Sequence, residues 1–171
     1  MGVDTIAYKT YGAPAAITIS SAGIVNKPLN PMMRAHVGTA QDNITRDVWT
    51  TVTFNHEDYD IGSNYNNGTY TFTAPVSGYY LLNMSIQIFT DTNSGGVHYI
   101  RFCLDGATNI SGTERTAQAV SGKNVVLQLT DVYYIVATHT IVGQIYYSGT
   151  GNVEDIPAYD NACFMSITLL A

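Results

Sequence analysis

The sequence predicts an all-β protein, a ten-stranded jelly-roll sandwich. Helical periodicity is nearly absent, whereas short runs rich in Val, Ile, Thr, Tyr and Phe recur between turn residues such as Asn66-Asn67-Gly68 and Asp105-Gly106. About ten runs at this spacing are typical of a sandwich or a jelly roll. The 171 residues suffice for one domain with a buried core.

Ten runs are expected to form the strands. In chain order they are 17–20, 33–38, 49–54, 69–75, 78–90, 97–105, 124–130, 132–138, 140–148 and 162–170. Residues 1–30 contain only one or two short strands before a segment punctuated by proline. We therefore expect residues 1–30 to form an arm or collar and residues 31–171 to form the jelly-roll domain.

The run from 78 to 90 is the longest and has two distinct faces. One face is apolar at a period of two and is expected to point into the sandwich: Tyr80, Leu82, Met84, Ile86 and Ile88. The other face carries Tyr79, Leu81 and Phe89, which makes it more apolar than a solvent-facing strand usually is. These three residues are assigned to a contact with another subunit, and cover by a loop of the same chain is an alternative of comparable weight.

Composition excludes several classes of function. Seven basic residues against thirteen acidic ones give a net charge of -6, so the chain lacks the cationic surface that nucleic-acid binding needs. No apolar run reaches the roughly 18 residues of a membrane span. The start MGVDTIAYKTYG has no basic segment followed by an apolar one, so no signal peptide is expected. Cys103 and Cys163 lie in strand-like runs and are expected to be buried free thiols.

The pattern FNHEDYDIGSNYNNGTYTFTAPVSGYYLL at residues 54–82 combines an Asn and an aromatic-Asp pair with a Gly, a Phe-containing strand, a Pro, a Gly and a tyrosine-rich strand. This order resembles the signature of the C1q-like globular domain. The matching positions are Asn55, Tyr59, Asp60, Gly68, Phe72, Pro75, Gly78 and Tyr80. The resemblance extends over residues 31–171, with departures at Thr130 and Ser166, where the family usually has Gly.

The resemblance implies a jelly roll of the C1q and tumour-necrosis-factor (TNF) type, usually assembled as a compact homotrimer. Animal members carry a collagen stalk, but this sequence has no Gly-X-Y repeat, which disfavours a complement context. The lead-in ITISSAGIVNKPLNP is similar to the connector before the terminal head of many bacteriophage fibre and virion surface proteins.

Catalytic patterns are absent from the sequence. The Ser-Gly pairs lack the G-x-S-x-G context of a hydrolase and are interpreted as turns. The histidines show neither H-x-H nor H-E-x-x-H spacing, so each is expected to be an ordinary strand or loop residue and not a zinc ligand; they are His36, His56, His98 and His139. We therefore predict that the protein is not an enzyme and has no cofactor.

One acidic cluster, Glu57, Asp58 and Asp60, has two interpretations. It could chelate Ca²⁺ or form a carboxylate pair. The favoured interpretation is structural: Asn55 and Asp60 accept hydrogen bonds from backbone amides, and Glu57 and Asp58 form a solvated bend. Members of the family that the sequence resembles sometimes hold Ca²⁺ near the trimer apex, but no motif places such a site here.

The favoured function is a non-enzymatic, homotrimeric virion surface protein of a bacteriophage, a fibre head that binds a glycan or protein of the host surface. One alternative is a capsid decoration protein whose residues 1–30 clamp the major capsid protein. Another is a secreted C1q/TNF-like ligand that clusters a receptor. The virion roles place the protein on the virion surface, outside the cell. Recognition is expected in the polar loops at 91–96, 106–116 and 148–161.

Overall fold

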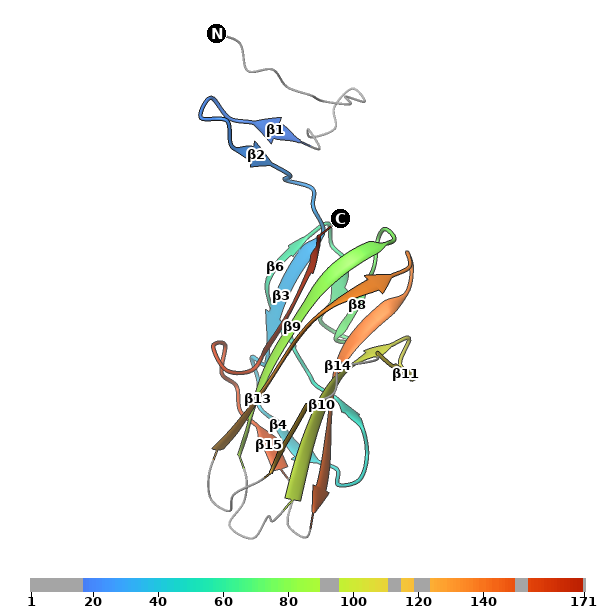
Figure 1. Ribbon diagram of the computed structural model, residues 1–171. Helices are drawn as coiled ribbons and strands as arrows, with labels where there is room; N and C mark the ends of the chain where they lie inside the picture. The colour runs from blue at the N-terminus through green and yellow to red at the C-terminus, as the bar shows by residue number, and fades with distance from the viewer. Residues whose placement is uncertain (1–16, 90–95, 111–114, 119–123, 150–153, 171) are drawn as a thin grey trace.

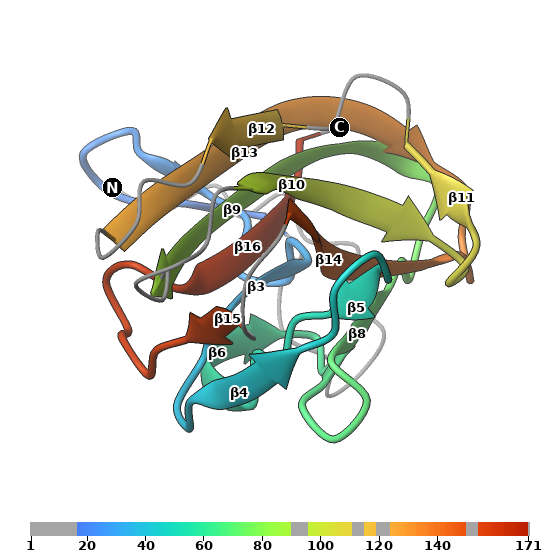
Figure 2. The same ribbon diagram turned by 90° about the horizontal axis from the view of Figure 1, so that it is seen from below.

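The computed structural model describes residues 17–89, 96–110, 115–118, 124–149 and 154–170. These residues form strands, turns and bends, and no helix occurs among them. The described part of the chain accordingly offers no helix of the length and apolarity that crossing a membrane requires. All strand pairs are antiparallel, and two sheets face each other as a sandwich (Figures 1 and 2).

Each sheet has five principal strands. In spatial order the first sheet contains β6 (His56–Ile61), β3 (Met32–His36), β16 (Phe164–Leu169), β9 (Gly78–Phe89) and β13 (Asn124–Ile135), with β15 (Glu154–Ile156) and β4 (Gln41–Ile44) extending it. The second contains β7 (Tyr65–Asn66), β8 (Thr71–Thr73), β14 (Thr140–Gly149), β10 (Gly96–Leu104) and β12 (Arg115–Gln118), with β5 (Thr50–Thr51) and β11 (Thr108–Asn109) beside them. The predicted ten-stranded jelly roll is confirmed.

The predicted division into strands at 124–130 and 132–138 is wrong, because β13 runs through both. Thr130 and Asp131 pair in register with Asn83 and Leu82 of β9. The Thr130 hydroxyl donates a hydrogen bond to Oδ1 of Asn83 over 3.0 Å. The polar residues Thr130 and Asp131 look like a turn between two strands in the sequence. Pairing with β9 and the hydrogen bond to Asn83 instead hold them within one continuous strand.

Sequence patterns also missed the edge strand β6. Glu57 and Asp58 were predicted to form a solvated bend, but they belong to β6, which pairs with β3. The segment HEDYDI lacks the alternation of apolar residues that marks a half-buried strand. Such polar composition is common at a sheet edge, where charged side chains discourage pairing with another chain.

The core confirms the inward face predicted for β9. Tyr80, Leu82, Met84, Ile86 and Ile88 are all fully buried between the sheets. Opposite them, β14 approaches closely at Gly143, where an added Cβ would lie 2.6 Å from Sδ of Met84 and 3.0 Å from a ring carbon of Phe54. Glycine at this position therefore allows the two layers to pack at this distance.

A small hairpin precedes the sandwich. β1 (Thr18–Ile19) pairs with β2 (Val25–Asn26), and the hairpin lies beyond the end of the sandwich at which β16 finishes (Figure 1). Asn30 ties the lead-in to the head, because its Nδ2 donates a hydrogen bond to the carbonyl of Leu169 over 2.7 Å. Residues 1–16 lie outside the described residues, and the division into an arm at 1–30 and a domain at 31–171 stays a prediction.

Candidate functional site

An exposed apolar stripe runs along the outer face of β9 and β13, on the side of the first sheet that faces away from the core. Its members are Tyr79 and Leu81 of β9 and Val126, Val132 and Tyr134 of β13. Tyr79 is 54% exposed, Val132 48% and Tyr134 50%, whereas Leu81 is half-buried. We call these five residues the interface stripe. An apolar patch exposed on a protein surface is a candidate interaction site.

Sheet pairing joins four members of the stripe into two adjacent rows. Tyr79 pairs in register with Tyr134, and their rings meet edge to face with centroids 5.2 Å apart. Leu81 pairs with Val132 on the next row of the same face. The sequence prediction included Tyr79 and Leu81 but missed the partners on β13, although their period-two alternation with the buried Leu127 and Leu129 is visible in the sequence.

Phe89, the third predicted contact residue, lies at the other end of β9. Its side chain is 40% exposed, and its ring meets that of Tyr159 edge to face at 6.4 Å. Thus Tyr159 of the same chain contacts the Phe89 ring without covering it. The assignment of Tyr79, Leu81 and Phe89 to a subunit interface stays a prediction.

A polar row interrupts the apolar surface near the middle of the sheet. Asn83 of β9 lies between Thr130 of β13 and Ser166 of β16 in register. Thr130 and Ser166 are the two positions at which the sequence departs from the resemblance noted above. The departures, far apart in the chain, therefore fall on one row of the same face.

Two of the motif residues belong to the core. Phe72 and Tyr80 are fully buried, and their rings meet edge to face at 5.8 Å. The Tyr80 hydroxyl donates a hydrogen bond to the carbonyl of Val76 over 2.8 Å. These residues join the two sheets and present no reactive group to solvent.

Two further motif residues hold loops. Oδ1 of Asn55 accepts a hydrogen bond from the backbone N–H of Gly38 over 2.8 Å. Oδ2 of Asp60 accepts one from the N–H of Tyr65 over 2.8 Å, and the Tyr65 hydroxyl donates to the carbonyl of Phe54. Asn55 and Asp60 thus bind backbone amides, which is the role that the sequence interpretation gave them.

The remaining motif residues shape turns or the surface. The N–H of Gly68 donates to Oδ1 of Asn66, and Tyr59 is exposed on β6. Gly78 is the first residue of β9, and its φ is not positive. The chain passes from β8 to β9 through bends at 75–77, which begin at Pro75.

A comparison with known protein families shows to which family this chain belongs. Residues 36–150, more than half of the chain, match the family of the C1q domain. The chain belongs to the C1q domain family. It has no match among curated proteins.

Solved structures share this fold at low identity. The globular domain of zebrafish complement 1qA is 13% identical, with a TM-score of 0.61 over 83% of this chain and 98% of that one. Eiger TNF from S. frugiperda is 10% identical, with a TM-score of 0.59 over 84% and 92%. Murine APRIL is 10% identical, with a TM-score of 0.60 over 82% and 99%. These likenesses show the C1q/TNF jelly roll alone.

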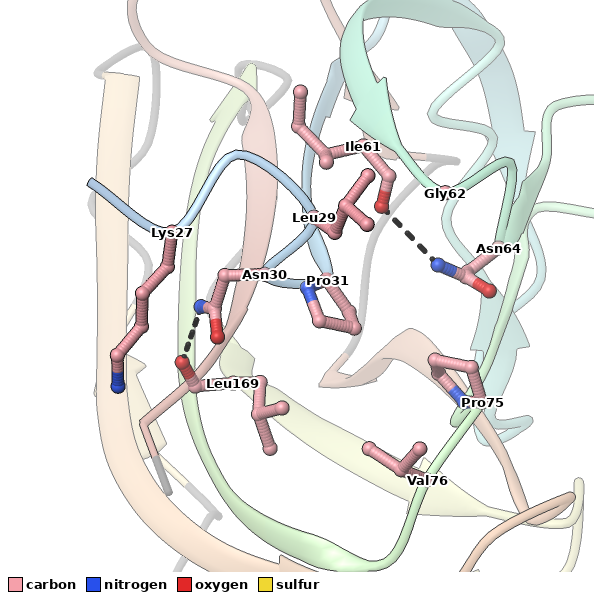
Figure 3. Close-up of a pocket in the computed structure, with 10 residues that line it drawn as sticks. All are labelled: Lys27, Leu29, Asn30, Pro31, Ile61, Gly62, Asn64, Pro75, Val76 and Leu169. Atoms are coloured by element: carbon pink, nitrogen blue, oxygen red, sulfur yellow. Dashed lines mark hydrogen bonds between the residues drawn. The ribbon is translucent and has the colours of Figure 1, made fainter. Parts of the chain in front are cut away.

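The C1q domain has a pocket of about 470 Å³ where the lead-in meets the sandwich (Figure 3). Its lining is mostly apolar: Leu29, Pro31, Ile61, Gly62, Pro75, Val76 and Leu169, with Lys27, Asn30 and Asn64 as polar members. Figure 3 shows both amides already bonded to backbone carbonyls, Asn30 to Leu169 and Asn64 to Ile61. No acid–base pair occurs among these lining residues.

The loops predicted to carry recognition are only partly described. Residues 91–95, 111–114 and 150–153 lie outside the described part of the C1q domain. The segments predicted to be free of strands at 106–116 and 148–161 contain the short strands β11 and β15, so this expectation is wrong there. β11 and β15 have only two or three residues, too short to give a periodic signal, and the ends of β12 and β14 also enter these segments.

The acidic cluster does not converge on one point in this C1q domain. Asp58 contacts Arg34 and His36 of β3, whereas Asp60 binds the amide of Tyr65. Ca²⁺ prefers six to eight oxygen ligands. Glu57, Asp58 and Asp60 therefore do not fit a calcium site of their own.

The two cysteines of the C1q domain are free and buried, as predicted. Burial raises the pKa of both thiols, Cys103 and Cys163, above the ordinary value. A thiol with a raised pKa is a poor nucleophile near neutral pH, because the thiolate is the reactive form.

His98 of β10 is a fully buried histidine, stacked on Tyr147 with ring centroids 5.0 Å apart. Burial disfavours the imidazolium and lowers the pKa of His98 to about 4 from 6.5. As the pH falls from 6.5 to 4, His98 becomes protonated in the unfolded chain but stays mostly neutral in the folded chain. The folded C1q domain therefore loses stability across this window.

We predict that this single group costs about 3 kcal/mol of the unfolding free energy between pH 7 and pH 4. His98→Phe keeps the stacked ring and removes the titration. Urea unfolding of both proteins at pH 7, 5.5 and 4 measures the effect, because all other groups are shared. The variant should gain on the wild type as the pH falls. A difference between the two proteins that does not change with pH would contradict the prediction.

Proposed function

We propose that this chain is a non-enzymatic, homotrimeric binding head in which the interface stripe of each protomer packs against a neighbour. The observation that carries the proposal is the exposed stripe of Tyr79, Leu81, Val126, Val132 and Tyr134. Domains of the C1q/TNF type form homotrimers and bind receptors.

A trimer closed around a threefold axis would bury the interface stripe of each protomer, and this burial would stabilise the assembly. Full burial of a large apolar side chain contributes roughly 1.5–3 kcal/mol, and a cyclic trimer buries three copies of each. A closed cyclic assembly also leaves no complementary surface free for further growth. The polar row at Asn83, Thr130 and Ser166 supplies hydrogen-bonding groups within this surface.

The binding end is proposed to be the one away from the hairpin. The end of β9, the start of β10 and the end of β14 lie at the end of the sandwich opposite β1 and β2 (Figure 1). A head that is attached through its lead-in presents this end outward. Loops at such positions carry recognition in many folds because they are free of the packing constraints of the sheets.

For this head we propose a place on the virion surface of a bacteriophage, at the tip of a fibre, with a host glycan or protein as its ligand. Support comes from the lead-in, which forms a separate hairpin before the head. The proposed absence of a catalytic role is supported by four motif residues with structural roles: Phe72 and Tyr80 pack in the core, and Asn55 and Asp60 bind backbone amides.

Light scattering on the purified chain tests the assembly. We expect a mass close to three times the 18.5 kDa of one chain at micromolar concentration. A mass near that of one chain would overturn the trimer. Antibodies against the head, applied to virions and viewed by electron microscopy, test the location: label at fibre tips supports the proposal, whereas label over the capsid or on no virion contradicts it.

A further inference from the structure

Three side chains with metal-ligating atoms gather on the outer face of β3 and β6, at the edge of the first sheet. His36 pairs in register with His56, and Asp58 follows two residues later on β6. One ligand atom of each side chain lies within 4.8 Å of the other two. The three residues come from strands that are separated by 20 positions in the chain, and only sheet pairing brings them together.

A β-bulge places the carboxylate. The register between β3 and β6 shifts between Arg34 and Ala35, so Asp58 is the extra residue of β6 without a partner of its own in register. Bulges commonly redirect a side chain beside a functional site. Here Oδ1 of Asp58 lies 2.9 Å from Nδ1 of His36, and the two imidazole rings stack with centroids 4.4 Å apart.

Arg34 holds the second carboxylate oxygen. Its Nη1 donates to Oδ2 of Asp58, which leaves Oδ1 directed toward the histidines. Arg34 is itself anchored, since Nη2 donates to the carbonyl of Asp160 over 2.5 Å and the guanidinium lies above the ring of Phe164. Carboxylates that bind metals are typically oriented by such a hydrogen bond to the oxygen that faces away from the ion.

We infer that His36, His56 and Asp58 form a binding site for Zn²⁺ or a closely related divalent transition metal. Two imidazoles and a carboxylate are a common zinc ligand set, with a water molecule in the fourth position. Tetrahedral zinc holds its ligand atoms about 3.4 Å apart, given bonds of about 2.0–2.1 Å. Closing the present spacing requires the exposed His56 side chain to rotate out of its stack on His36, so that both imidazoles can direct a ring nitrogen at one ion.

The chemistry of the set selects the ion. Ca²⁺ and Mg²⁺ prefer oxygen ligands and bind weakly to a site in which two of three ligands are imidazoles. The guanidinium of Arg34 compensates the carboxylate and lowers the affinity for any cation. We therefore expect zinc affinity in the micromolar range, with a metal ion joining the edge strand β6 to β3.

Titration of the untagged full chain with ZnCl₂ after chelator treatment tests the site. Calorimetry at pH 7.5 should show one zinc per chain, no heat with CaCl₂, and a rise in melting temperature with zinc. His56→Ala, an exposed position, should weaken zinc binding at least tenfold.

The matched control is His139→Ala, which removes a histidine that is paired with one aspartate, Asp105, in the second sheet. It should leave zinc binding unchanged. Equal zinc binding by His56→Ala and the wild type, or no binding by the wild type at about 100 μM zinc, would overturn the site. His36→Gln, checked for folding by circular dichroism, gives an independent second variant. None of these results depends on the mass of the assembly.

Discussion

Substituting Val132 by arginine is expected to turn the proposed trimer into folded monomers. Val132 is 48% exposed in the isolated chain, so the sandwich itself tolerates a longer side chain there. In the assembly, the three arginine side chains would lie near one another, and each charge would be buried away from water. Burying an unpaired charge costs several kcal/mol for each copy. Light scattering should show the mass of one chain, while circular dichroism retains the β-type spectrum.

The control for this prediction is Thr73→Arg, an exposed position on β8 of the second sheet. It adds the same charge away from the interface stripe and should leave the mass unchanged. Should the Val132 variant fail to fold, Tyr134→Ser removes apolar area without adding charge and should shift the trimer toward dissociation. A trimer of unchanged concentration dependence in both stripe variants would show that the stripe is not the interface.

Truncating Phe72 to alanine is expected to cost about 3–5 kcal/mol of the unfolding free energy. The ring is fully buried between the sheets, against Tyr80, and Phe72 pairs in register with Ile141. A cavity at this point removes contacts from both layers at once. Urea unfolding at one fixed chain concentration measures the loss, since the stability of an oligomer depends on concentration.

Tyr80→Phe is the comparison for this site. It keeps the packed ring and removes only the hydrogen bond to the carbonyl of Val76, so it should cost about 1 kcal/mol. If Phe72→Ala cost no more than Tyr80→Phe, the motif phenylalanine would not be the contact that joins the two sheets.

Several elements of the fold were readable from local pattern. The inward face of β9 was predicted residue by residue, because alternation at a period of two is set by the pleat of a single strand. The burial of Cys103 and Cys163 followed from their place in strand-like runs. By contrast, β6 and the continuity of β13 were missed, since polar residues at an edge or across from a polar partner give no apolar alternation.

The recognition of the family also came from the sequence. Its motif combines core residues such as Phe72 with residues that bind loop amides such as Asn55 and Asp60, and these roles are local. The grouping of His36 with His56, by contrast, was not predicted from the sequence. Spacing along the chain suggested ordinary strand or loop residues, and sequence spacing alone cannot show which distant strands pair.

The sequence by itself thus determined the β character of the chain, the side chains that fill its core and the family to which it belongs, because each follows from short-range periodicity and motif spacing. Only the tertiary structure decided which distant residues share a surface. Pairing of β9 with β13 creates the interface stripe, and pairing of β3 with β6 brings His36 to His56 and Asp58. The physical reason is that strands far apart in the chain come together only when the whole sandwich folds. Burying each apolar face then sets their register, because a shift of one residue would turn every side chain to the other face.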